Sequence, residues 1–122
     1  MLRRETVDVV QINYSLAEPE AERRLLPLAR DRGVAVVVNR PFAAGGLLAA
    51  LRGRPLPPWA AELGCGSWAQ LFLKWVPGHP AVTCVIPGTS RPQHLADNMG
   101  AGVGALPDAA ARERMRRAVA DA

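Results

Sequence analysis

The residues best suited to chemistry lie between Val85 and Asn98 (VIPGTSRPQHLADN). An apolar strand end is followed by a short polar turn and then by the start of a helix, with Arg91 and His94 close by. Backbone N–H groups at a helix N-terminus attract anions, and neighbouring cationic side chains strengthen that attraction. The pattern favours binding of a nucleotide phosphate. A plain helix start with a solvated arginine and histidine has the same sequence, so this second interpretation stays open.

The elements that position this segment alternate along the chain. Strand-like runs of β-branched residues are followed each time by a helical pattern, which predicts βα units and a parallel sheet. The sequence predicts strands over residues 7–14, 34–38 and 82–86, helices over 18–32, 67–75, 92–99 and 107–120, a short helix at 59–63, and a Gly- and Pro-rich loop from 41 to 58.

Local signals support these boundaries. Gly33 is expected to end the first helix, Ser67 to cap the second, and Pro107-Asp108 to start the last. The run Val34 to Val38 is apolar throughout, which predicts a strand covered on both faces. Three parallel strands leave two unpaired edges, so such a chain is expected to be part of a larger sheet or barrel, or to self-associate through those edges.

Composition limits the class of protein. The chain has 122 residues, 49% hydrophobic and 21% charged, which predicts a single globular unit over residues 1–122. The net charge is +4, and Lys74 is the only lysine among scattered arginines. No basic stretch is interleaved with aromatic residues, so a nucleic-acid partner is not expected.

Cysteine usage and the absence of long apolar runs indicate a cytoplasmic protein. Cys65 and Cys84 show no metal-ligand spacing, and both are expected to be small buried residues with free thiols rather than a disulfide. No run is long enough to span a bilayer, and the start at Met1 to Arg4 does not resemble a secretory signal. Neither a membrane nor a metal is therefore expected as a partner.

Five segments together resemble the aldo/keto reductase family in order and spacing. They are Val7 to Ser15 (VDVVQINYS), Leu25 to Ala29 followed by Arg32-Gly33-Val34, Asn39 to Phe42 (NRPF), Trp68 to Gln70, and Ile86 to Ser90 with Asp97-Asn98. The resemblance covers nearly the whole chain but only the C-terminal part of the family's (β/α)8 TIM barrel. It implies that the three βα units are strands six to eight, followed by a C-terminal helix.

The resemblance also implies a cofactor, NADP(H), lying across the carboxyl ends of the strands, where barrel enzymes place their chemistry. Gln11 matches the glutamine that binds the nicotinamide carboxamide, although a barrel-interior glutamine paired with backbone is the alternative. Asn39 occupies the position of an aromatic residue that stacks on the nicotinamide ring, and asparagine has no such face. Arg40, Phe42 and the segment 43–46 (AAGG) match the loop that approaches the pyrophosphate through backbone N–H groups.

The last motif carries the strongest resemblance. Gly88 lies in its turn, and Thr89, Ser90, Arg91 and His94 match the residues that hold the adenosine 2′-phosphate. Arg91 has a guanidinium fork that can grip a phosphate with two hydrogen bonds, which favours NADP over NAD. Asp97 and Asn98 match the positions that contact the adenine.

The family's catalytic groups have no counterpart here. Its chemistry uses a tyrosine acid tuned by a lysine, an aspartate and a histidine on the early strands, and no residue of this chain matches that set. Tyr14 is predicted to pack in the core or at the rim, Lys74 to extend its charge to the surface from a helix, and His79 to lie in a turn. No catalytic residue is therefore assigned.

Two functions remain. The first, which the resemblance implies, is that the chain is the NADP-binding, C-terminal portion of an oxidoreductase that reduces a small carbonyl substrate to an alcohol once the missing half is supplied. Alternatively, it is a non-catalytic fragment that binds nucleotide phosphate or self-associates through its open sheet edges. In both, the isolated chain is expected to be inactive.

Overall fold

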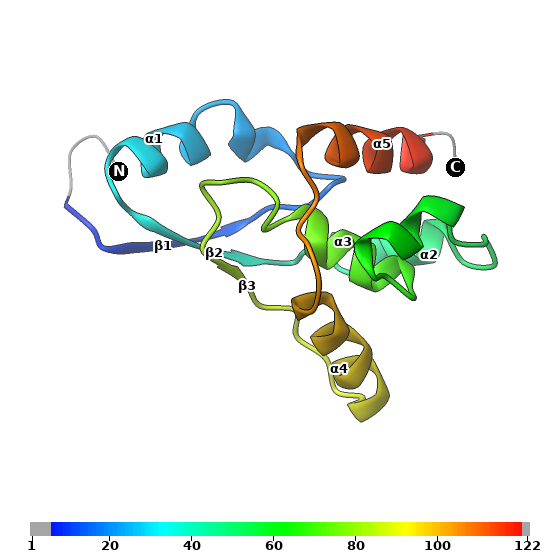
Figure 1. The fold of residues 1–122 in the computed structure, drawn as a ribbon. Coiled ribbons are helices and arrows are strands. Elements are labelled where there is room, and N and C mark those ends of the chain that lie inside the picture. The colour runs from blue at the N-terminus through cyan, green and yellow to red at the C-terminus, as the bar shows by residue number, and fades with distance from the viewer. Residues whose placement is uncertain (1–5, 121–122) are drawn as a thin grey trace.

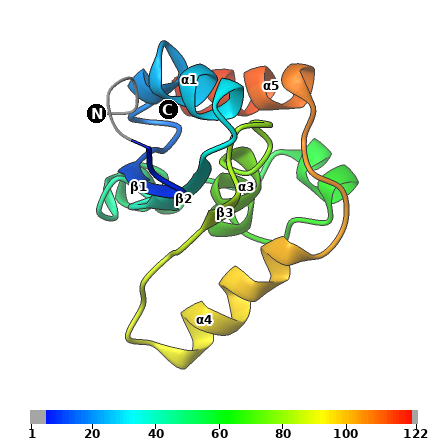
Figure 2. The ribbon, with the colours of Figure 1, turned by 90° about the vertical axis from the view of Figure 1, so that its left-hand side faces the viewer.

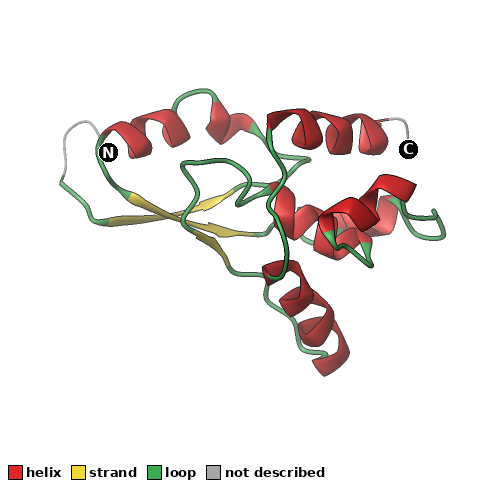
Figure 3. Cartoon of the chain, in the orientation of Figure 1, coloured by secondary structure: helices red, strands yellow, loops and turns green. Residues whose placement is uncertain are grey.

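The chain forms an α/β fold with a three-stranded parallel sheet, seen here in a computed structural model that describes residues 6–120. Residues 1–4, on which the expectation of no secretory signal rests, lie outside the described residues. Helices and strands alternate along the chain (Figures 1 and 3). The elements are β1 (Val9–Asn13), η1 (Glu20–Glu22), α1 (Leu25–Asp31), β2 (Ala35–Asn39), α2 (Gly46–Ala50), η2 (Pro58–Leu63), α3 (Trp68–Trp75), β3 (Cys84–Val85), α4 (Pro92–Met99), η3 (Gly100–Gly102) and α5 (Ala109–Ala120).

The sheet order is β1-β2-β3, with both pairings parallel, as the alternation predicted. Gln11 lies opposite Val37, which in turn lies opposite Cys84, and Asn13 lies opposite Asn39. Both α1 and α5 lie on one side of the sheet, whereas α4 projects on the other (Figures 1 and 2). Because both pairings are parallel, the carboxyl ends of the strands meet at one edge of the sheet, where binding sites in such folds commonly lie.

Several boundaries differ from the predicted ones for identifiable reasons. The helix expected over 18–32 is interrupted: η1 ends at Glu22, and Arg24 has a non-helical φ of −139° before α1 begins. Pro27 is consistent with this later start, because it lacks the N–H that a helix reaching back to Glu18 would use there. The segment 41–58 is not all loop, since α2 forms within it. The third strand is shortened to Cys84–Val85, while α4 has the predicted bounds.

The two faces of the sheet differ in burial. Val10, Val36 and Val38 are buried on the face that α1 covers. On the other face, Val9 is 55% exposed and Gln11 and Asn13 are exposed as well. The expectation that β2 is covered on both faces is therefore wrong within the described residues, because its second face packs against no complete layer of this chain.

For two side chains, the observed burial is the opposite of the predicted burial. Lys74 is fully buried, and its Nζ donates hydrogen bonds to the carbonyl oxygens of Leu63, Val103 (2.6 Å) and Ala105 (3.1 Å). It therefore does not extend to the surface. Cys84 is exposed on the open face of the sheet, whereas Cys65 is buried as predicted, and both thiols are free. Across residues 6–120, no helix is long and apolar enough to cross a bilayer.

Candidate functional site

A cavity of about 760 Å³ lies at the carboxyl ends of β2 and β3. One wall is the segment from Asn39 through α2 to Arg54, a second is the N-terminus of α3, and the third is the turn after β3 together with α4. Parallel strands deliver their ends to the same edge, and the connections that follow them fold around it. The cavity thus lies where α/β proteins commonly bind ligands.

Most of the residues predicted from the sequence line this cavity. They are Asn39, Arg40, Phe42, Gly88, Thr89, His94, Asp97 and Asn98. The structure does not bring Gln11, Ser90 or Arg91 into the lining. Gln11 is exposed on the open face of the sheet, and Arg91 is exposed at the start of α4, where its N–H donates to Thr89 Oγ1 at 3.3 Å. Of the pair Arg91 and His94, only His94 therefore contributes to the cavity wall.

Asn39 ends β2 with a polar atom that lacks a partner. Its Oδ1 is buried and accepts no hydrogen bond among the described residues. Leaving a buried acceptor unpaired costs about 1–3 kcal/mol. Because this residue lines the cavity, the unpaired oxygen is suited to receive an N–H or O–H from a bound molecule.

The segment after Asn39 turns sharply with an unusual backbone. Arg40, Ala43 and Ala44 have φ angles of 52°, 51° and 56°, in the left-handed region that non-glycine residues seldom adopt. The N–H groups of Ala43 and Gly45 donate to the carbonyls of Arg40 and Phe42, both at 3.0 Å. These two hydrogen bonds close the turn, and the approach of this loop to a pyrophosphate stays a prediction. Strained backbone of this kind is often found at ligand sites.

Sequence reasoning missed four lining residues with useful chemistry: Arg52, Arg54, Ser67 as a cavity wall, and Trp68. The two arginines looked like part of the scattered surface charge, because the predicted loop gave them no location. In the structure the segment after α2 lies beside the start of α3, where Trp68 Nε1 donates to the Arg54 carbonyl at 3.0 Å. Trp68 also stacks on Phe72, with ring centroids 6.0 Å apart. The spacing of Arg52 and Arg54 directly after an apolar helical run was the one available signal.

Helix α4 is attached to α3 through Asp97. Ser67 Oγ donates to Asp97 Oδ2 at 2.6 Å, and Gln70 Nε2 donates to Asp97 Oδ1 at 3.1 Å. Ser67 also caps α3 as predicted, since its Oγ accepts from the Gln70 N–H at 3.1 Å. The Asp97 carboxylate is therefore already engaged by α3, whereas Asn98, its neighbour in the cavity wall, makes no comparable side-chain bond among the described residues.

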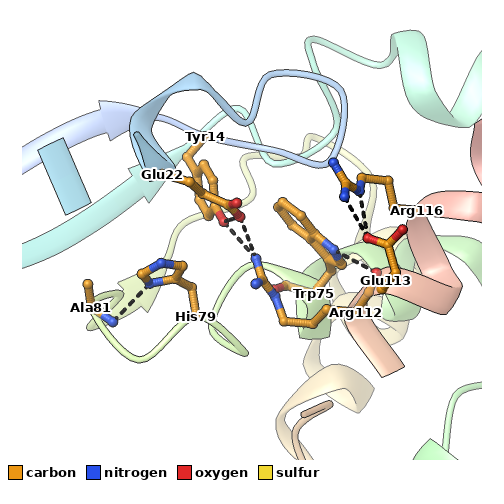
Figure 4. A network of polar contacts seen from close by, with 8 residues as sticks. All are labelled: Tyr14, Glu22, Trp75, His79, Ala81, Arg112, Glu113 and Arg116. Carbon is orange, nitrogen blue, oxygen red and sulfur yellow. Dashed lines mark hydrogen bonds and ion pairs between the residues drawn. The ribbon is translucent and has the colours of Figure 1, made fainter. Parts of the chain in front are cut away.

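Tyr14 lies outside the cavity, in a polar network shown in Figure 4. It is fully buried, as expected for a packing role, donates its hydroxyl proton to Glu22, and accepts from Arg112 Nη2 at 2.7 Å. Arg112 also pairs with Glu22 at 2.8 Å and lies 4.2 Å from the centre of the Trp75 ring. Burial and the bond to Glu22 raise the pKa of Tyr14 far above its ordinary value. This network fastens α5 to η1 and α3.

His79 lies beside this network in a turn, as predicted. Its Nδ1 accepts from the Ala81 N–H at 3.1 Å, so protonating that nitrogen would break the bond. Burial, and then the charge of Arg112, lower the pKa of His79. Burial alone would raise the pKa of the Glu22 carboxyl, but the hydrogen bonds from Tyr14 and Arg112 outweigh it and lower that pKa below its usual range.

Acidification is therefore expected to destabilise the fold in two stages. Below about pH 6.5 the unfolded chain gains a proton on His79 that the folded chain resists, and below about pH 4.5 the same holds for Glu22. Stability is lost as the pH falls through each range.

Urea unfolding at pH 7.5, 5.5 and 4.0 measures this loss of the free energy of unfolding. Glu22→Gln should flatten the loss below pH 4.5, whereas Glu20→Gln, at an exposed neighbour, should not; identical pH curves for both variants would contradict this account.

Among residues 6–120, no group of three His, Cys, Asp or Glu residues is placed to hold a metal ion. The cations, amides and aromatic rings that line the cavity suit anion binding, hydrogen bonding and stacking.

Comparison with known proteins places this geometry in context. A sequence model described as the aldo/keto reductase family matches residues 3–114. The fold is similar to the holo and apo forms of an aldo-keto reductase, AKR11C1, from Bacillus halodurans, with TM-scores of 0.70 and 0.71 and 24% identity over 95% of this chain. It is also similar to a thermostable aldo-keto reductase, Tm1743, solved with the inhibitor epalrestat (TM-score 0.68, 21% identity, 95% of this chain). The chain spans 44%, 44% and 41% of those structures' lengths.

Proposed function

The chain belongs to the aldo/keto reductase family, and we propose on that basis that it is the NADP-binding part of a carbonyl-reducing oxidoreductase. Residues 1–122 correspond in this proposal to strands six to eight of a (β/α)8 barrel and the helix that follows. The reduction of a small carbonyl substrate to an alcohol then requires the earlier strands, supplied by the same polypeptide or by another.

Two observations support the assignment to part of a barrel. The face of the sheet that bears Val9, Gln11 and Asn13 is exposed, although Val9 on it is apolar and β-branched. In a closed barrel this face is the interior, filled by side chains from the other strands. The chain also covers less than half of each similar solved structure.

The cavity fits a dinucleotide phosphate cofactor. Arg40, Arg52 and Arg54 place cations in its walls and His94 adds an imidazole, while Asp97, the one acidic residue among the described residues of the lining, is held by hydrogen bonds from α3. Trp68 and Phe42 offer flat apolar surfaces of the kind on which a base or ring can pack. The unpaired Asn39 oxygen at the end of β2 is the observation that carries the proposal, because a carboxamide N–H would satisfy it.

Within this proposal the chain binds and orients. A nicotinamide cofactor supplies the hydride. Asn39 accepts a hydrogen bond at the inner end of the cavity, and the arginines neutralise phosphate charge at its rim. Thr89 and Arg91, in the turn after β3, lie near the 2′-phosphate, with Arg91 at the rim rather than in the wall. Among residues 6–120, no tyrosine or lysine lines the cavity, so this proposal assigns proton donation to the alcohol to the earlier strands.

Paired substitutions test cofactor binding. The variant Arg52→Ala/Arg54→Ala is expected to weaken NADPH binding at least about tenfold, because it removes two cations from the cavity wall. Arg91→Ala should weaken NADPH binding more than NADH binding, since NADH lacks the 2′-phosphate. Isothermal titration of the 122-residue chain measures both affinities.

Arg32→Ala, at an exposed site beyond α1, is the control for loss of charge alone. It should leave both affinities within about twofold of the original chain. Equal losses in Arg32→Ala and in the double variant would mean that net charge, and not the cavity, attracts the nucleotide. Unchanged NADPH affinity in the double variant would remove Arg52 and Arg54 from the site.

A further inference from the structure

Gln70 is the centre of a closed set of hydrogen bonds between α3 and α4. Its Oε1 accepts from the Gly66 N–H at 2.7 Å, and its Nε2 donates to the Asp97 carbonyl at 2.8 Å and to Asp97 Oδ1 at 3.1 Å. Ser67 Oγ then donates to Asp97 Oδ2 at 2.6 Å. Each side-chain polar atom of Gln70 and Asp97 thus has a partner within the set.

The arrangement allows only one orientation of the Gln70 amide. If the amide were turned over, its NH2 group would face the Gly66 N–H, and its oxygen would face the Asp97 carboxylate. Both contacts would be repulsive, because each would join two donors or two acceptors. The set therefore specifies how α4 sits on α3, in addition to contributing attraction.

The end of α4 fits closely against the same side chain. A Cβ atom on Gly100 would lie 2.4 Å from Gln70 Nε2, which is closer than non-bonded atoms approach. Gly100 has an ordinary helical φ of −61°, so its backbone conformation does not require glycine. The close approach of Gln70 is what excludes a side chain at this position.

Helix α4 carries the third wall of the cavity. His94, Asp97 and Asn98 lie on it, and the turn with Gly88 and Thr89 leads into it. Outside the Gln70 set, α4 is largely exposed: Leu95 is 53% and Met99 68% exposed. Few other contacts are therefore available to hold the helix in place, and a small shift of α4 would move the whole wall.

We propose that Ser67, Gln70 and Asp97 are positioning residues that hold α4 over the cavity, and that Asp97 acts through α3 and not by contacting the bound nucleotide. This inference rests on the proposed function for its effect on NADPH. Asn98, buried beside Asp97 in the cavity wall and without a comparable bond, is then the residue of this pair that faces the base.

An exchange of the two functional groups tests the proposal. Gln70→Glu alone places two carboxylates about 3 Å apart and should loosen α4, with amide exchange of residues 94–99 faster by at least about tenfold. The double variant Gln70→Glu/Asp97→Asn restores a donor opposite an acceptor between the two side chains, and it keeps an acceptor for Ser67 and for the Gly66 N–H, but the main-chain carbonyl of residue 97 then faces a carboxylate oxygen in place of an N–H. Exchange should therefore be slower than in Gln70→Glu by at least about threefold without reaching that of the original chain, and NADPH affinity should follow it.

Gln93→Glu is the matched control, since it adds the same charge at an exposed position of α4 outside the set. It should leave amide exchange of 94–99 unchanged. Slower exchange in the double variant than in Gln70→Glu, with no recovery of NADPH affinity, would show that Asp97 contacts the nucleotide, and would overturn the proposal. Unchanged exchange in Gln70→Glu would overturn it too. Failure of the original chain to bind NADPH would instead reject the proposed function, while the exchange measurements would still decide how α4 is held.

Discussion

Lys74→Met is expected to lower the free energy of unfolding by about 3–5 kcal/mol, among the largest losses for a single residue. The Lys74 ammonium group is fully buried and joins three carbonyl oxygens, from Leu63, Val103 and Ala105. Methionine fills a similar volume but donates nothing, so three acceptors would lose their partner in a buried place. Urea unfolding followed by circular dichroism measures the change.

The geometry around Lys74 leaves little room for compensation. A Cβ on Gly104 would lie 3.2 Å from its Nζ, and Gly104 has a φ of 86°, so the segment that carries Val103 and Ala105 wraps closely around the amine. Arg30→Met, which removes a charge from an exposed position on α1, should change stability by less than about 0.5 kcal/mol. A Lys74→Met variant within 1 kcal/mol of the original chain would show that water replaces the ammonium group readily.

The second large effect concerns turnover. The 122-residue chain is expected to show no carbonyl-dependent oxidation of NADPH, whereas a complete enzyme of this kind gains about 10²–10⁴-fold from general-acid catalysis alone. Tyr14 is held in the network of Glu22 and Arg112, where burial raises its pKa, and Lys74 is enclosed by carbonyls. Neither lines the cavity, so neither can donate a proton to a substrate bound there.

Absorbance at 340 nm with an aldehyde substrate measures this turnover. A parallel preparation of Arg52→Ala/Arg54→Ala corrects for traces of other reductases. Oxidation of NADPH by the original chain above that background would contradict the proposal that proton transfer depends on strands other than these three.

Local signals in the sequence predicted much of the fold. Ser67 and Pro92 mark helix starts that the structure confirms, and Gly33 ends α1 with a φ of 67°. These features depend on residues within one turn of each other. The alternation of strand and helix likewise depends on local periodicity, and it predicted the parallel sheet correctly.

The errors concern contacts between distant segments. Lys74 looked like a surface residue because nothing in α3 reveals that carbonyls from residues 63, 103 and 105 converge on it. Arg52 and Arg54 were missed because α2 was not expected, and α2 is what brings them to the cavity. The open face of β2 was missed because an apolar strand sequence predicts two covered faces without showing whether residues of this chain or of other strands cover them.

In the candidate site, too, local features were predicted and contacts between distant segments were not. The residues from Gly88 to Asn98 could be placed together because one turn and one helix carry them. The packing of α4 against α3 decides whether Arg91 enters the cavity. It also decides which oxygens of the Asp97 carboxylate are free to contact a ligand. That packing joins residues 27 and more positions apart, which no short motif encodes.

The most direct test is a titration of the 15N-labelled chain with NADPH, followed by NMR. We expect saturable shifts of amide signals around Asn39, Arg52, Thr89 and Asn98, together with a shift of the Asn39 side-chain amide, and little change at the Tyr14 network. Shifts confined to other surfaces, or no saturable change up to millimolar NADPH, would contradict the claim that this chain holds the cofactor.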